Sequence, residues 1–321
     1  MTRARGLLLA LVSLAAAGLV LVWMFLGSAT IAKDTSFTIP AGASVSSVAD
    51  KLEGEGLISS ASGFVLQARV FGSETPIQAG EFLLTRGMSQ GDILAAFQSG
   101  DVIRRFVTVP EGMPSILVWE RLMAEDLLTG EIAVPPEGSI LPDTYAFERG
   151  QTRQSLIEQM QAAMDKALAE EWAKRSPRIA VDTMRDALIL AAIVEKETGK
   201  PEERRMVAGL YSNRVRTGMM LQADPTIIYP ITKGKPLGRR IRQSEIAAVN
   251  GYNTYTRVGL PEGPITNPGR DSIAAVMNPE DTGALFMVAD GTGGHWFAAT
   301  LAEHNANVAK WYAIRRERGE M

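Results

Sequence analysis

The sequence predicts an α+β protein with an N-terminal transmembrane helix, a small α+β module and a larger mixed α+β domain. Three observations support this fold class. The chain begins with a long uncharged stretch, short β-type runs alternate with helical apolar spacing over residues 34–105, and longer amphipathic patterns dominate residues 106–321. A chain of 321 residues is also long enough for two domains of ordinary size.

The stretch from Gly6 to Leu26 holds no charged residue and is long enough to cross a hydrocarbon core of ~30 Å as a helix. Arg3 and Arg5 precede it, so the positive-inside rule keeps the N-terminus cytoplasmic and exports the bulk of the chain. A cleavable signal peptide is the alternative, but the apolar run exceeds the usual h-region of roughly 7–15 residues. We therefore expect residues 1–33 to form a single-pass anchor in the inner (cytoplasmic) membrane, with the rest of the chain in the periplasm.

Residues 34–105 have the pattern of a small α+β module. A short strand, 36–39, precedes a helix whose apolar residues recur at helical spacing. A second strand, 80–84, is followed by a helix over 88–98, and Ser89 is positioned to cap that helix. The boundary with the next domain is expected between residues 100 and 110.

The larger domain, residues 106–321, mixes helices with a few strands. Pro and Gly are dense between residues 135 and 145, which predicts a connector there. The sequence predicts a strand at 103–109, helices at 115–125, 152–174, 182–198, 201–218, 244–249, 271–277 and 301–318, and a hairpin that pairs 285–289 with 295–298.

The composition narrows the possible chemistry. The absence of cysteine excludes thiolate nucleophiles, thiolate metal sites and disulfides. The net charge of −3 does not indicate binding to nucleic acid, which usually requires a basic surface. No HExxH, GxSxG or Walker A string occurs, and the two histidines lack a metal-ligand pattern. The chemistry that remains is that of carboxylates. Amide and hydroxyl side chains, which suit a polyhydroxylated substrate, would support it. We expect no metal and no cofactor.

Glu197 ends an almost purely apolar helical run and is the candidate catalytic residue. Burial raises the pKa of a carboxyl, and a raised pKa is what a general acid needs at neutral pH. Glu197 shares a helix face with Leu190, Ile193 and Val194, whereas Glu195 points about 200° around the helix. The pattern therefore favours Glu197 over Glu195, although a solvated helix terminus is the simpler alternative.

Polar and aromatic side chains beyond this helix are candidates for substrate contact. Asp224 either caps a short helix over 225–229 or contacts sugar, and Gln222 has the same ambiguity. Asn lies mid-helix at position 213, where it is unfavourable unless its amide has a partner. The segment 252–255 is either a sugar-binding face or a strand with alternating burial. The predicted substrate-binding residues are Asn213, Gln222, Asp224, Thr226, Tyr252, Asn253, Thr254, Tyr255, Asn267 and His295.

The strings IVEKET, NRVRTGMMLQADPTIIY, YNTYTRVGLPEGPITNPG and VADGTGGHWF, with EHN after them, occur in this order. With them the chain, from about residue 36 onward, resembles the MltG-type (YceG-like) endolytic murein transglycosylases. The resemblance implies that residues 34–105 are a LysM-like module that binds N-acetylglucosamine-containing glycans. It also implies that residues 106–321 are a YceG-like catalytic domain in which Glu197 falls at the catalytic glutamate.

The same resemblance implies the reaction and the partners. The substrate would be peptidoglycan glycan strands, cleaved internally at the β-1,4 bond between N-acetylmuramic acid and N-acetylglucosamine to leave 1,6-anhydromuramic ends. Glycan-polymerising enzymes of cell-wall synthesis are the implied protein partners. One carboxyl suffices, because the C6 hydroxyl of muramic acid attacks its own anomeric carbon.

Two alternatives stay open at this point. The first is a catalytically silent, membrane-anchored glycan-binding protein. The second is a glycoside hydrolase in which Glu197 and Asp224 act as a carboxylate pair, since ordinary glycoside hydrolysis uses two such groups.

Overall fold

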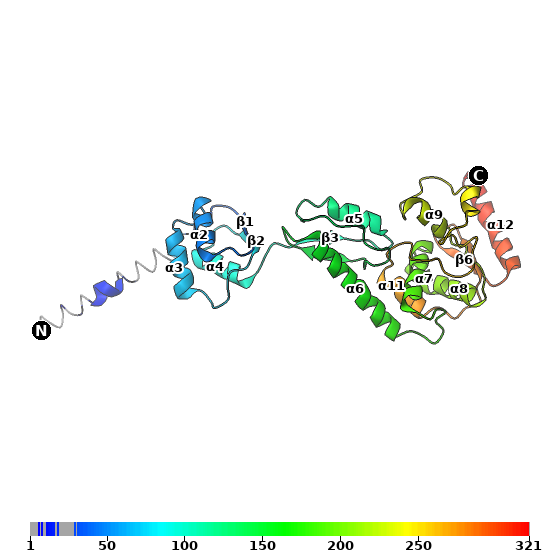
Figure 1. Cartoon of the computed structure of the whole chain (residues 1–321), viewed down its shortest axis with the longest axis horizontal. Coiled ribbons are helices and arrows are strands. Elements are labelled where there is room, and N and C mark those ends of the chain that lie inside the picture. The colour runs from blue at the N-terminus through cyan, green and yellow to red at the C-terminus, as the bar shows by residue number, and fades with distance from the viewer. Residues whose placement is uncertain are drawn as a thin grey trace. The chain divides into compact units, whose positions relative to one another are not determined.

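The structure is a computed structural model that describes residues 6, 8, 11–16, 18, 29 and 31–320 (Figure 1). Its contacts divide the chain into two compact units, Met1–Arg105 and Phe106–Met321. Both units combine helices with short strands, so the α+β class is confirmed.

The expected transmembrane segment falls mostly on residues that the structure does not describe. Of residues 6–26, only 6, 8, 11–16 and 18 are described. Within the described parts of the chain, no helix combines the length and apolar character that membrane crossing requires. The anchor therefore stays a prediction from the sequence.

The first unit is built on a two-stranded antiparallel sheet, with Phe37 opposite Phe82. Aromatic packing forms its centre, because the ring of Phe97 lies 5.6 Å from that of Phe37 and 4.9 Å from that of Phe82. Ser89 caps the last helix through a capping box, as predicted. The elements are β1 (Thr35–Ile39), α2 (Val45–Gly54), α3 (Ala61–Phe71), β2 (Gly80–Leu84) and α4 (Gln90–Ser99). Helix α3 was not predicted, and the LysM-like character with its glycan binding stays a prediction.

The second unit begins with a two-stranded sheet packed beside a long helix. This part contains β3 (Arg105–Thr108), α5 (Ser115–Met123), β4 (Thr144–Phe147) and α6 (Arg153–Ala173), and β3 pairs with β4. The predicted connector over residues 135–145 was wrong for its last two residues, because β4 begins at Thr144. The backbone N–H of Val109 donates to the Asp143 carbonyl at 2.8 Å, which fastens the strand in place. Val118, Leu122 and Leu156 fill the core between these elements.

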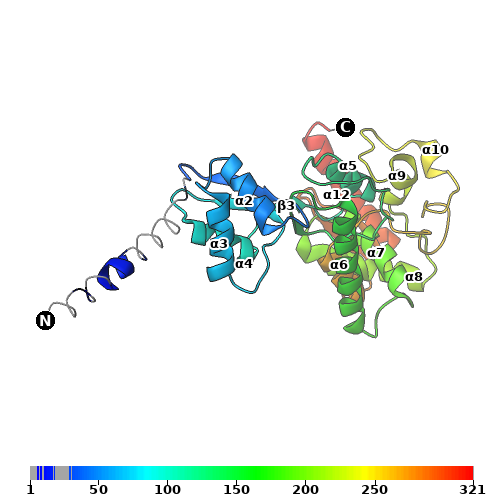
Figure 2. The ribbon, with the colours of Figure 1, turned by 60° about the vertical axis from the view of Figure 1, so that its left-hand side comes forward.

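Helix α7 (Met184–Glu197) is the centre of the second unit. Residues 189–194 are at most 1% exposed, because α6, α8, α9 and α11 all pack against this helix (Figures 1 and 2). Thr183 caps its first turn by accepting a hydrogen bond from the Asp186 N–H. The surrounding helices are η1 (Pro201–Glu203), α8 (Arg204–Arg216), α9 (Pro225–Thr232), α10 (Gln243–Ile246) and α11 (Arg270–Met277).

A hairpin and a final helix complete the unit. Strand β5 (Phe286–Ala289) pairs antiparallel with β6 (His295–Ala298), so that Ala289 lies opposite His295. This confirms the predicted hairpin. Helix α12 (Leu301–Glu317) follows, with Thr300 and Glu303 forming a capping box at its start.

Candidate active site

Glu197 is the last residue of α7, and the chain turns away immediately after it. Thr198 has extended backbone angles and is buried. The apolar body of α7 therefore holds the Glu197 carboxyl at a fixed point, where it is only partly accessible to water. Glu195 faces elsewhere, because its Oε2 accepts a hydrogen bond from the Gly269 N–H at 3.0 Å, at the start of α11. The two acids thus have separate surroundings, as the helical spacing predicted.

Burial raises the pKa of Glu197 to about 7, and the nearby negative charge of Asp224 adds to the effect. A hydrogen bond from Tyr211 and the positive charge of Arg214 act in the opposite direction but do not outweigh them. A carboxyl with this pKa is protonated in a large fraction of molecules at neutral pH. It can therefore donate a proton and take it back.

Tyr211 and Arg214 line the site from α8, and neither was predicted from the sequence. They lie three residues apart, which places them on one face of the helix. Tyr211 is fully buried and donates to the Glu197 carboxylate, and burial raises the pKa of this tyrosine, so its hydroxyl keeps its proton. Arg214 is fixed by carbonyls, donating to Leu285 at 2.7 Å and to Leu221 at 2.5 Å.

Asp224 contacts Tyr255 and does not cap α9. Its backbone is helical and its side chain makes no capping hydrogen bond, so the cap alternative was wrong. Its Oδ1 accepts a hydrogen bond from the Tyr255 hydroxyl at 2.6 Å. Asp224 is exposed, which leaves its charge available to a ligand.

The start of α9 and the loop before it are fastened to the segment before Tyr255 by two buried hydroxyls. Thr226 Oγ1 and Thr254 Oγ1 lie 2.8 Å apart, and Thr254 Oγ1 also accepts from the Ala223 N–H at 3.0 Å. Gln222 lies in this loop with a φ of 51°, a left-handed conformation that costs energy for a residue with a side chain. The side chain of Gln222 is exposed, whereas the two threonines are fully buried and act as framework.

The three candidate asparagines bind backbone groups of the protein itself. Asn213 donates to the Thr282 carbonyl at 2.7 Å. Asn253 donates to the Ala248 carbonyl at 2.7 Å. Asn267 accepts from the Ile140 N–H at 3.0 Å and donates to the Met113 carbonyl at 2.9 Å. These amides position loops around the site, and sugar contact at the three positions stays a prediction.

Tyr252 also packs within the protein. Its ring lies 4.8 Å from that of Tyr229. The carboxyl of Glu137 lies close enough to both phenols for its negative charge to raise their pKa. Burial raises the pKa of Glu137, although its carboxylate accepts a hydrogen bond from the Ser115 N–H at 2.9 Å. This second carboxyl with a raised pKa was not predicted, because it lies within the Pro- and Gly-rich segment.

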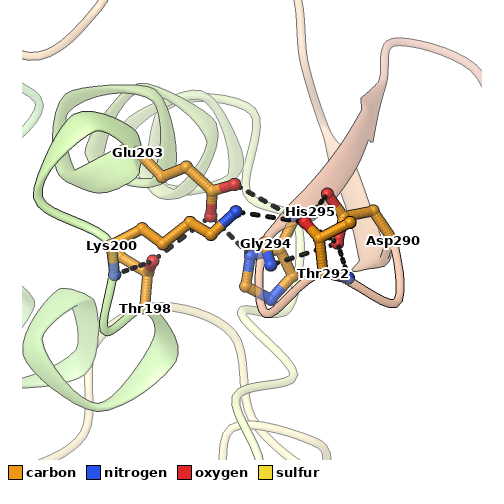
Figure 3. A network of polar contacts seen from close by, with 7 residues as sticks. All are labelled: Thr198, Lys200, Glu203, Asp290, Thr292, Gly294 and His295. Atoms are coloured by element: carbon orange, nitrogen blue, oxygen red, sulfur yellow. Dashed lines mark hydrogen bonds and ion pairs between the residues drawn. The ribbon is translucent and has the colours of Figure 1, made fainter.

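His295 belongs to a polar network that links the hairpin to the end of α7 (Figure 3). Its Nδ1 lies 2.8 Å from Glu203 Oε2, and its backbone N–H donates to Glu203 Oε1 at 2.9 Å. Thr198, the residue after Glu197, donates to the same carboxylate at 3.2 Å. Burial would raise the pKa of Glu203, but the hydrogen bonds from His295 outweigh it and lower the pKa.

The hairpin tip adds a second set of contacts to this network (Figure 3). Lys200 Nζ donates to the Thr292 hydroxyl at 3.2 Å, and Asp290 accepts from the Thr292 and Gly294 N–H groups. A Cβ at Gly294 would lie 2.3 Å from Glu203 Oε1, so a larger residue here would displace the Glu203 carboxylate from its present position. Within the described residues, no group of acids and histidines is arranged to hold a metal ion.

Comparison with known proteins identifies the family of the chain. The model of the YceG-like family matches residues 37–310, which includes Glu197 and the residues around it. The chain belongs to the YceG-like family. The predicted family is thereby confirmed.

Relatives of this YceG-like chain include two proteins named endolytic murein transglycosylase. The one from Streptococcus pneumoniae serotype 2, strain D39, is 30% identical over 322 residues, a match that covers 85% of this chain and 57% of the relative. The chain thus spans little more than half the length of that relative. The one from Bacillus subtilis strain 168 is 27% identical, and the match covers 90% of this chain and 89% of the relative.

A solved structure also resembles the chain. The crystal structure of a YceG-like protein from Listeria monocytogenes superposes with a TM-score of 0.52 at 26% sequence identity. The superposition covers 85% of this chain and 99% of the other.

Proposed function

We propose that this protein is an endolytic peptidoglycan lytic transglycosylase. It cleaves the β-1,4 bond between N-acetylmuramic acid and N-acetylglucosamine within glycan strands and leaves 1,6-anhydromuramic ends. The observation that carries the proposal is the partly buried Glu197 carboxyl, whose pKa is about 7 and which Tyr211 holds by a hydrogen bond. The names of the relatives support the same reaction class.

The proposed reaction uses Glu197 twice. Its carboxyl protonates the glycosidic oxygen as the bond from that oxygen to the anomeric carbon breaks, and the N-acetylglucosamine side leaves as an alcohol. The C6 hydroxyl of the muramic residue then attacks the anomeric carbon and gives its proton to the Glu197 carboxylate. The carboxyl is restored, no water is consumed, and the intramolecular attack benefits from a high effective molarity.

Asp224 and Arg214 assist without exchanging protons. Positive charge develops at the anomeric carbon as the bond breaks, and the exposed Asp224 carboxylate stabilises that charge by Coulomb attraction. The Tyr255 hydroxyl fixes the orientation of this carboxylate. Arg214 moderates the pKa of Glu197 so that its conjugate base is stable enough to form.

We also propose that the enzyme acts at the periplasmic side of the inner membrane, anchored by the segment 6–26. Its uncharged composition and the preceding arginines support this location. The first unit would bind glycan as a LysM-like module, and glycan-polymerising enzymes would be partners. A reporter that is active only in the periplasm, fused after Met321, should be active, and an inactive reporter would contradict the topology.

Mass analysis of the products tests the proposed function. Purified glycan strands treated with the enzyme should gain anhydromuramic ends, each lighter than a reducing end by one water. Reducing ends would show the two-carboxylate hydrolase, in which Glu197 and Asp224 act together. Unchanged strands would show the catalytically silent glycan-binding protein.

A further inference from the structure

A pocket of about 490 Å³ is lined by residues that neighbour both acids of the candidate site in the sequence, and it has no part in the proposed proton transfers. Lys196 and Pro225 line it, and they are the chain neighbours of Glu197 and Asp224. The other lining residues come from the segment before and within α5, from α9 and the segment after it, and from the loop before α11. They are Pro110, Glu111, Gly112, Met113, Pro114, Leu117, Ile228, Gly234, Lys235, Pro236, Leu237 and Ile265.

The walls of this pocket are preformed. Gly234 has a φ of 84°, and a Cβ there would lie 2.6 Å from Cβ of Pro114, so the two segments touch closely. The Gly112 N–H donates to the Asn267 carbonyl at 3.0 Å, and the Asn267 amide donates to the Met113 carbonyl. These hydrogen bonds fix the segment before α5 against the loop that precedes α11.

The pocket is mostly apolar, and its lining includes the charged side chains of Glu111, Lys196 and Lys235. Two of these are already paired, since Lys235 contacts Glu120 at 2.5 Å and Glu111 forms an ion pair with Arg204. Lys196 is exposed and forms no ion pair with any residue that the structure describes; its Nζ lies 3.4 Å from the Gly112 carbonyl. The charge left for a ligand is therefore positive.

This chemistry does not suit a sugar ring. Sugar subsites present amide, hydroxyl and carboxylate side chains to the ring hydroxyls. The pocket lining contains no Asn, Gln, Asp, Ser or Thr, and its one carboxylate, Glu111, is paired with Arg204. Apolar walls and a lysine that forms no ion pair with the described residues instead match a short peptide that has small aliphatic side chains and a carboxylate. Pockets of roughly 300–1,000 Å³ accommodate ligands of this size.

We propose that the pocket binds the peptide stem attached to the muramic residue whose bond is cleaved. The apolar walls take up the alanine side chains of the stem, and Lys196 binds one of its free carboxylates. This inference rests on the proposed function, because the peptide is part of the same substrate. Binding of the stem here holds the muramic residue next to Glu197, which lies one position along α7.

The test compares two forms of one substrate. Glycan strands with uncrosslinked tetrapeptide stems are assayed beside the same strands after an amidase has removed the stems. The parent enzyme should cleave the stem-bearing strands with a kcat/KM about tenfold higher, which corresponds to about 1.4 kcal/mol. Lys196→Gln should remove most of this preference, and Lys196→Arg should retain it because it keeps the charge.

Two further variants make the test specific. Ile228→Asn places a polar group on the apolar wall and should also reduce the preference. Lys166→Gln changes an exposed lysine of α6, which does not line the pocket, and should leave the preference as in the parent. A parent that cleaves both substrates equally well, or a Lys196→Gln variant that keeps the full preference, would overturn the inference.

A binding measurement separates failure of this inference from failure of the proposed function. A parent enzyme that cleaves neither substrate contradicts the proposed reaction. Calorimetry with the free tetrapeptide then still decides what the pocket binds. Binding to the parent and Lys166→Gln but not to Lys196→Gln supports a peptide site, and no binding to the parent contradicts it.

Discussion

The Tyr255 hydroxyl donates a 2.6 Å hydrogen bond to Oδ1 of Asp224, the acid whose charge helps to raise the pKa of Glu197. The loops that carry the two partners are fastened to each other by the buried pair Thr226 and Thr254. The position of the exposed carboxylate relative to the proton donor is therefore determined by tertiary packing. The first prediction depends on that arrangement.

Asp224→Asn should shift the pH dependence of cleavage. The negative charge of Asp224 raises the pKa of Glu197, so its removal lowers that pKa and moves the alkaline limb of kcat/KM to lower pH. At neutral pH we expect a loss of about tenfold, smaller than the roughly 10²–10⁴-fold loss typical of removing a general acid. A pH–rate profile checks this, and a loss as large as that of Glu197→Gln would indicate a carboxylate pair.

Tyr211→Phe should have the opposite effect on the pH profile. The hydrogen bond from Tyr211 stabilises the Glu197 carboxylate, so its removal raises the pKa of Glu197 and moves the alkaline limb to higher pH. The buried carboxyl also loses a partner, which should lower the free energy of unfolding by about 1–3 kcal/mol. An alkaline limb unchanged in position would show that Tyr211 does not contact Glu197 in solution.

Glu197→Gln should stabilise the protein in a pH-dependent way. The folded-state pKa of Glu197 is about 7, above the ordinary value of 4.5, so the parent loses stability as pH rises between these values. Glutamine stays neutral, so the variant should be more stable than the parent at pH 8, by an amount on the order of 2–3 kcal/mol. Below pH 4 the difference should vanish. Urea unfolding of both proteins at both pH values measures it, and a stability difference between variant and parent that is the same at both pH values would contradict the raised pKa.

Glu203→Gln should loosen the hairpin from the end of α7. Glutamine can accept only part of the hydrogen bonds that Glu203 receives from Thr198 and His295. We expect the free energy of unfolding to fall by about 1–3 kcal/mol and kcat to fall with it, since Thr198 follows Glu197 directly. Glu202→Gln, at the exposed neighbouring position, is the matched control and should change neither quantity. Equal effects of the two substitutions would mean that the network has no positioning role.

The placement of Glu197 could be predicted because it depends on local periodicity. Once residues 184–197 form a helix, the spacing of the apolar residues determines which acid lies beside the core and which points away. Tyr211 and Arg214 could not be predicted in the same way. Their contact with Glu197 depends on how α8 packs against α7, and nothing within the sequence of α8 itself determines that packing.

The polar candidates illustrate the same limit. The mid-helix amide of Asn213 correctly indicated that a partner exists, but the sequence does not tell a backbone carbonyl from a sugar hydroxyl. Asp224 before Pro225 has the local pattern of a helix cap, yet a tyrosine 31 residues away takes the carboxylate instead. Strand β4 was missed for a related reason, because its pairing with β3 outweighs the turn-forming residues that precede it.

Cleavage in water enriched in heavy oxygen tests the central claim most directly. If Glu197 catalyses attack by the C6 hydroxyl, the parent enzyme produces anhydromuramic ends that contain no heavy oxygen, because no water enters the product. Glu197→Gln should produce almost no new ends, while Glu195→Gln should produce them at close to the parent rate. New reducing ends that carry one heavy oxygen atom, or anhydro ends formed by Glu197→Gln at the parent rate, would contradict the claim.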